Sequence, residues 1–216
     1  MIIKPVFSAL SSKYPELDSC LSDIGKAYEL LEGSYSMGGQ VLVCGNGGSA
    51  SDSEHIVGEL MKGFMQKRPV PAAFREELGA LFPGEEAEIC DNLQGALPAI
   101  SLVSHTALMT AFMNDVSADM VFAQQVYGYG RPGDALIGLS TSGNSRNVVR
   151  ALQVAKAKGM KTIGLTGRTG GRMKELCDAV ICVPWDSTPD IQERHLPIYH
   201  ALCIALEDRF FSPYPE

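Results

Sequence analysis

The sequence predicts an α/β fold in which helices cover both faces of a mainly parallel sheet. Short apolar runs alternate with helical segments along most of the 216 residues, which is the pattern of consecutive βα units. The runs are continuous rather than alternating, which is typical of strands buried on both faces. The length fits one ordinary domain, so residues 1–216 are expected to form a single domain.

Each element has its own local justification. The first 37 residues are expected to be largely helical, because apolar positions recur at three-to-four spacing over residues 14–35 and Gly38 and Gly39 follow. The predicted strands are residues 40–44, 99–103, 135–139, 161–165 and 179–183. The predicted helical segments are residues 50–64, 107–112, 118–127, 145–158, 171–176 and 191–211. Pro197 is expected to kink the last helix or to mark its first turn.

Residues 67–97 differ in character from the rest of the chain. Three prolines and two acidic pairs, Glu76-Glu77 and Glu85-Glu86, fall in or beside this stretch. We expect an irregular excursion with one or two short helices, because the segment is too short to build its own core.

Composition excludes several classes of function. Hydrophobic residues make up 45% of the chain, which is ample for a packed core. The net charge of −7 argues against a general binder of nucleic acid or of anionic membranes. No apolar run approaches the roughly 20 residues of a membrane span, and the N-terminus lacks the pattern of a signal peptide. The six cysteines are scattered without a C-x-x-C pair, so we expect a reduced, cytoplasmic protein without disulfides.

Two polar loops follow apolar strands and precede helices. The first is the glycine loop CGNGGS at residues 44–49, and the second is STSGNS at residues 140–145. Glycines allow a ligand to approach the backbone, and hydroxyls beside a helix start suit a phosphate ester. Neither loop is a P-loop or a Rossmann fingerprint, so no nucleotide cofactor is expected. A sharp turn and a helix cap remain the alternatives to ligand binding.

Two helices carry side chains suited to proton transfer or metal binding. His55 and Glu59 lie four residues apart and therefore share one helix face. Gln192 and His200 lie eight residues apart, about 80° around an ideal helix, and can border one site. A solvated helix pair and a buried core histidine are the alternatives, and His195 could equally be a surface residue.

Taken together, these motifs resemble the phosphoheptose isomerases of the sugar isomerase (SIS) domain family. The resemblance covers residues 14–64 and 98–212 and includes the order CGNGGS, His55-x-x-x-Glu59, Asn114-Asp115, STSGNS, LTGRTGG and Ile191-Gln192-Glu193-x-His195 through His200. It implies a three-layer SIS sandwich and a homo-oligomer, commonly a tetramer. The resemblance leaves residues 67–97 as an insertion relative to compact members.

The resemblance also implies roles for individual residues. Glu59 and His200 would be the acid/base pair of an aldose–ketose isomerase. The implied substrate-binding residues are Asn46, Gly47, Gly48, Ser49, Asn114, Asp115, Ser140, Thr141, Ser142, Ser145 and Gln192. In members that carry zinc, the ligands would fall on His55, Glu59, Gln192 and His200.

The expected reaction is the interconversion of sedoheptulose 7-phosphate and D-glycero-D-manno-heptose 7-phosphate through an enediol. The alternative is a non-catalytic SIS module that binds a sugar phosphate or a protein partner, such as a replication initiator. We favour the enzyme, because that alternative class is expected to lack members of the acid/base or metal set, which is complete here.

Overall fold

The computed structural model describes residues 4–212 and contains one five-stranded sheet. The strands are β1 (Val41–Cys44), β2 (Ala99–Ser101), β3 (Ala135–Leu139), β4 (Lys161–Thr166) and β5 (Ala179–Cys182). Their order is β2-β1-β3-β4-β5, and all four neighbouring pairs are parallel. The predicted parallel α/β fold is therefore confirmed.

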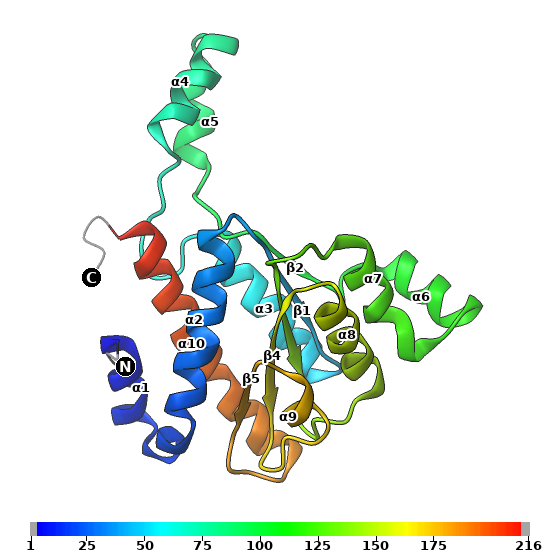
Figure 1. Cartoon of the computed structure of the whole chain (residues 1–216). Helices are drawn as coiled ribbons and strands as arrows, with labels where there is room; N and C mark the ends of the chain where they lie inside the picture. Colours follow the sequence, from blue (N-terminus) through cyan, green and yellow to red (C-terminus); the bar gives the residue numbers. More distant parts are fainter. Residues whose placement is uncertain (1–3, 213–216) are drawn as a thin grey trace.

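Alternate residues of β1, β2 and β3 contribute to two separate cores, one on each face of the sheet. Val41 and Val43 pack in a core with the N-terminal helices and the C-terminal helix, whereas Leu42 and Cys44 pack in the core on the other face. One face is covered by α1 (Pro5–Lys13), α2 (Leu21–Ser36), α3 (Gly48–Met61) and α10 (Thr188–Phe211). The other face carries α6 (Thr106–Asp115), α7 (Val121–Tyr129), α8 (Arg146–Ala157) and α9 (Met173–Leu176). The predicted three-layer sandwich is visible in Figure 1.

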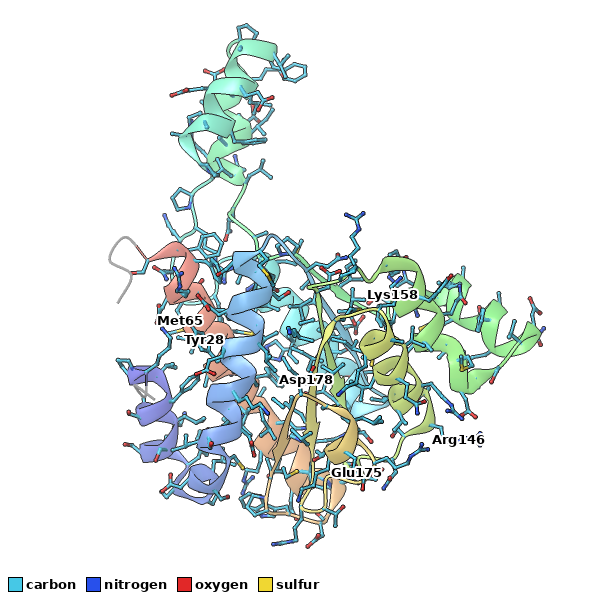
Figure 2. The ribbon with its side chains drawn as sticks, in the orientation of Figure 1. Tyr28, Met65, Arg146, Lys158, Glu175 and Asp178 are labelled. Atoms are coloured by element: carbon cyan, nitrogen blue, oxygen red, sulfur yellow. The ribbon has the colours of Figure 1, made fainter. Side chains whose placement is uncertain are left out.

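The N-terminal segment is helical, as predicted, with a 3₁₀ turn at Pro15–Cys20 between α1 and α2. Tyr28 on α2 lies towards α1 (Figure 2), and its ring meets Phe7 edge-on with 5.9 Å between centroids. A second 3₁₀ turn, Ala118–Met120, leads into α7. Among the described residues, no helix combines the length and apolar character needed to span a membrane.

The C-terminal helix begins three residues before its predicted start. Pro189 occupies its first turn, where a missing N–H costs nothing, and Pro197 lies inside the helix. Of the two alternatives given for Pro197, the first turn is therefore excluded, and the kink stays a prediction.

The insertion forms a hairpin of two short helices, α4 (Ala72–Leu81) and α5 (Glu86–Asn92), which we call the arm. The arm stands away from the body of the molecule, and its side chains project into open space (Figures 1 and 2). Helix α4 has no buried residue and α5 buries only Cys90. The segment therefore builds no core of its own, as expected from its length.

The two ends of the arm meet at a neck closed by buried charges. The Arg68 guanidinium, 1% exposed, pairs with Glu207 at 2.8 Å and donates to the carbonyl oxygens of Leu60 and Glu59. The amide of Gly95 donates to the Arg68 carbonyl at 2.6 Å. The chain therefore leaves and rejoins the body at one point.

Candidate active site

A polar cavity of about 420 Å³ lies where β1 and β3 end. It is lined by Asn46, Gly47, Gly48, Ser49, Leu139, Ser140, Thr141, Ser145, Thr188 and Gln192. These two strands are neighbours in the middle of the sheet, and the chain order reverses between them. In open α/β sheets, ligand crevices form at such a switch point.

Three helices begin at this cavity and give it a positive electrostatic character. Helix α3 begins at Gly48, α8 begins directly after Ser145, and α10 begins at Thr188. Each helix start offers unpaired backbone N–H groups and the positive end of the helix dipole. No lysine or arginine lines the cavity, so the helix starts and hydroxyls are what favour an anion there.

Side-chain hydrogen bonds shape the two loops around the cavity. Ser140 and Ser145 share a hydrogen bond of 2.8 Å between their hydroxyls. Asn46 and Asn147 exchange two amide hydrogen bonds of 2.9 and 2.8 Å, which join the glycine loop to α8. The Thr188 hydroxyl lies 3.4 Å from that of Thr141.

The glycines of LTGRTGG allow the STSGNS loop to pack closely against a neighbouring loop. Gly143 has φ of +66°, and a Cβ there would lie 2.1 Å from the carbonyl oxygen of Gly170. A Cβ at Gly171 would likewise lie 2.4 Å from the carbonyl oxygen of Ser142, so a side chain at Gly143 or Gly171 would push the two loops apart.

Three predicted binding residues do not line this cavity. The Ser142 hydroxyl accepts a hydrogen bond from the Asn144 amide within its own loop. Asn114 and Asp115 are exposed at the end of α6, where the Asn114 amide donates to the Asp115 carboxylate at 2.8 Å. Their binding roles stay predictions from the resemblance.

A second group of polar side chains lies between α3 and α10. His55 Nε2 is 3.2 Å from Glu59 Oε1 and 3.5 Å from His200 Nε2. The other carboxylate oxygen of Glu59 pairs with Lys62 Nζ at 3.0 Å. The predicted acid/base pair is thus brought to one place, with His55 between its members.

Tyr199 and Asp52 lie behind His55. The Tyr199 hydroxyl is 3.0 Å from His55 Nδ1 and donates to Asp52 Oδ1 at 3.3 Å. Burial raises the pKa of Tyr199, and Asp52 raises it further, so the phenol keeps its proton. Burial likewise raises the pKa of Asp52.

The environment of His200 favours its neutral form. Burial lowers the pKa of His200, and His55 lowers it further, although Glu59 acts in the opposite direction. His200 is only half-buried, and His195 is instead the fully buried histidine, with Nε2 3.3 Å from the Thr166 carbonyl oxygen. The alternative of a buried core histidine at His200 is wrong, because this side chain faces His55 on α3.

The donor atoms of His55, Glu59 and His200 suit a zinc ion in chemistry, and His55 lies at a ligand-to-ligand distance from each of the other two. Neighbouring ligands of a tetrahedral zinc ion with bonds near 2.0–2.1 Å lie about 3.4 Å apart, close to the two distances above. Gln192 is placed elsewhere, because its amide lies against Gly48 in the cavity. Among residues 4–212, no three His, Cys, Asp or Glu side chains are already arranged as a metal site, so zinc binding would require these side chains to reorient.

The structure adds residues that the sequence analysis did not identify as part of the site. Thr188 lies in a stretch without an apolar pattern, so no helix start was predicted there. Tyr199 lies in an apolar run beside His200, where it resembles a core residue. Asn147 and Asp52 carried no motif of their own, although each lies one turn from a motif residue. Asn147 is distinguished by its hydrogen bonds to Asn46, and Asp52 by the hydrogen bond it accepts from Tyr199.

Comparisons with known proteins agree on one family. The SIS domain family model matches residues 93–167. A phosphoheptose isomerase of Rhodospirillum rubrum is 39% identical over 196 residues, which cover 91% of this chain and 90% of the relative. One of Nitratiruptor sp. is 44% identical over 171 residues, covering 79% of this chain and 78% of the relative.

Solved structures give the same result. The phosphoheptose isomerase of Neisseria gonorrhoeae superposes with a TM-score of 0.72 at 33% identity, covering 93% of this chain and 94% of that one. The enzyme of Francisella tularensis superposes with a TM-score of 0.74 at 30% identity, covering 92% of each chain. This chain belongs to the phosphoheptose isomerase family of SIS-domain proteins.

Proposed function

We propose that this protein is an aldose–ketose isomerase that converts sedoheptulose 7-phosphate to D-glycero-D-manno-heptose 7-phosphate. The carrying observation is that α3 and α10 each connect the anion-binding cavity to the acid/base cluster. Gly48 and His55 lie on α3, and Gln192 and His200 lie on α10. This sharing of two helices supports a phosphate site and a proton-transfer site held in a fixed relation.

The spacing along α10 supports a long sugar phosphate. Gln192 and His200 are eight residues apart, which is about 12 Å along a helix. In an extended seven-carbon sugar 7-phosphate, eight bonds separate phosphorus from C1, and these span roughly 9 Å at the length per bond of an extended chain. A triose phosphate would span about half of that length, so the separation of the two groups along α10 favours the longer substrate.

The residues of the cluster have the chemistry that isomerisation requires. Glu59 takes the proton from one carbon and returns it to its neighbour, which forms and then consumes an enediol. His200 faces it from the other helix, and its neutral imidazole can move a proton between the two sugar oxygens. The phosphate, held at the helix starts, keeps the reacting carbons in position.

We also propose that zinc, where it is bound, is held by His55, Glu59 and His200, and that Gln192 completes the set once its side chain turns from Gly48 towards the cluster. The ion would supply positive charge that polarises the sugar carbonyl. Glu59 would be a weaker base as a zinc ligand, so its two roles are alternative or sequential.

The test is conversion of sedoheptulose 7-phosphate by the purified protein, with and without added zinc. Glu59→Gln is expected to lower kcat by about 100- to 10,000-fold, because it removes the general base. His200→Ala is expected to lower kcat at least about 100-fold, because it removes the imidazole that moves a proton between the sugar oxygens. Coupled detection of the heptose product measures both effects.

Glu54→Gln is the matched control, since Glu54 lies on the same helix and its carboxylate accepts only from Ser104 outside the cavity. It should retain wild-type kcat. A wild-type protein that binds the sugar phosphate but does not convert it, with or without zinc, would instead support the non-catalytic SIS module.

We further propose a homotetramer in the cytoplasm. An apolar groove of about 260 Å³ between α1 and α10 includes Leu196, Pro197 and His200, so a second copy seated there would lie beside the acid/base cluster. All six cysteines are free thiols, which suits a reducing compartment.

A further inference from the structure

Tyr199 sits between a carboxylate and the histidine at the centre of the acid/base cluster. Its side chain is 2% exposed, and its hydroxyl reaches Asp52 Oδ1 on one side and His55 Nδ1 on the other. Tyrosine has only one hydroxyl proton, so it can donate to only one of these two partners.

The hydrogen bonding of the Asp52 carboxylate indicates which partner receives the Tyr199 proton. Within residues 4–212, buried Asp52 Oδ2 has no hydrogen-bond partner, and Tyr199 is the donor to Oδ1. If the phenol turned its proton to His55, the half-buried Asp52 carboxylate would lose that donor, which is costly for an acceptor partly withdrawn from water. The proton therefore belongs on the Asp52 side, and the Tyr199 oxygen must accept from His55.

We propose that Tyr199, held by Asp52, is a positioning residue that fixes His55 as its Nδ1–H tautomer. His55 Nδ1 then donates to the Tyr199 oxygen, and Nε2 carries a lone pair. That lone pair faces Glu59 at 3.2 Å and His200 at 3.5 Å. Asp52 and Tyr199 together thus make His55 Nε2 a hydrogen-bond acceptor, rather than a donor, towards Glu59 and His200.

This arrangement has a consequence for the chemistry of the cluster, and that consequence rests on the proposed function. An ionised Glu59 and the lone pair of His55 are both acceptors, so only a proton or a cation can lie favourably between them. The site is thereby prepared to take up a proton from substrate, or a metal ion, at this position. In the opposite tautomer of His55, the hydrogen on Nε2 would itself occupy the position between His55 and Glu59.

The direct test is the tautomer of His55 in chelator-treated protein, measured by ¹⁵N–¹H NMR at pH 8. The chain has four histidines, so the His55 signals can be assigned with a His55→Gln variant. Wild type should show the Nδ1–H form. Tyr199→Phe and Asp52→Asn should each move His55 towards the Nε2–H form.

Kinetics give a second readout. Loss of an outer partner of a functional histidine typically costs about 10- to 100-fold in activity, so Tyr199→Phe should lower kcat by that factor with little change in KM, because the phosphate cavity is untouched. Tyr35→Phe is the matched control: its hydroxyl bonds the Pro98 carbonyl away from the site, and it should change neither the tautomer nor kcat.

An Nε2–H tautomer in wild type, or a tautomer unchanged in both variants, would overturn the proposal. Inactive wild-type protein would refute the proposed isomerase, but the tautomer measurement would still decide the role of Tyr199.

Discussion

At the scale of single residues, burial separates the histidines into different chemical roles. His195 is fully buried, and its Nδ1 finds no hydrogen-bond partner in the part of the chain that the structure describes. Burial lowers the pKa of His195 to about 4, despite the hydrogen bond to Thr166. His200 is only partly buried and keeps contact with the acid/base cluster. The first histidine therefore belongs to the core, and the second remains available for proton transfer.

The buried histidine should make stability depend on pH. His195 binds a proton near pH 6.5 when unfolded but only near pH 4 when folded. Its contribution is therefore complete above pH 6.5 and is lost as the pH falls towards 4, by up to about 3 kcal/mol in the free energy of unfolding. Urea unfolding of wild type between pH 7 and 4 should show this decline.

A His195→Gln variant should lose part of that slope, whatever its stability at pH 7. His105→Gln is the matched control, because His105 lies at the start of α6 and is only partly buried. An identical slope in wild type and His195→Gln would show that other groups cause the acid sensitivity.

At the scale of elements, the arm and its neck differ sharply in their contribution to stability. The arm buries almost nothing, whereas the neck places an ion pair in the protein interior. Arg68 also stacks on Phe211, with its guanidinium carbon 4.7 Å from the ring centre. Stability at this end of the molecule therefore resides in the neck.

Replacing residues 70–93 by a short Gly-Ser linker should change the free energy of unfolding by less than about 1 kcal/mol, because little surface is lost and a shorter loop closes more easily. Arg68→Ala should instead cost about 3–5 kcal/mol, because it leaves Glu207 buried without its partner. Chemical denaturation of the two variants measures the contrast. A deletion as damaging as Arg68→Ala would mean that the arm is part of the folding unit.

At the scale of the whole molecule, the elements that could be predicted from the sequence are those whose successive residues are buried and therefore apolar. Residues 135–139 are buried at every position, so their apolar run could be recognised without knowledge of the fold. The start of α10 at Thr188 could not be recognised, because Ser187-Thr188-Pro189-Asp190 has the composition of a turn. Likewise, nothing in the sequence indicates that Asn147 pairs with Asn46, since that contact depends on how two loops meet across the sheet.

The proposed assembly can also be tested at this scale. Leu196 is 39% exposed in the groove between α1 and α10, and Leu196→Glu would place a charge where a second copy is proposed to pack. We expect light scattering to give four times the 23.2 kDa chain mass for wild type and a smaller species for the variant. Leu93→Glu, at an exposed leucine beside the arm, should leave the mass unchanged. A monomeric wild type would exclude the tetramer.

The neck described above has an evolutionary consequence. Because the outgoing and returning chains touch at Arg68 and Gly95, the distance between them is almost independent of what is spliced in beyond them. Genetic insertions at this point can therefore be gained, lengthened or exchanged without moving the helices that carry Glu59 and His200. The neck is therefore a suitable point for attaching new segments, both during evolution and in protein engineering.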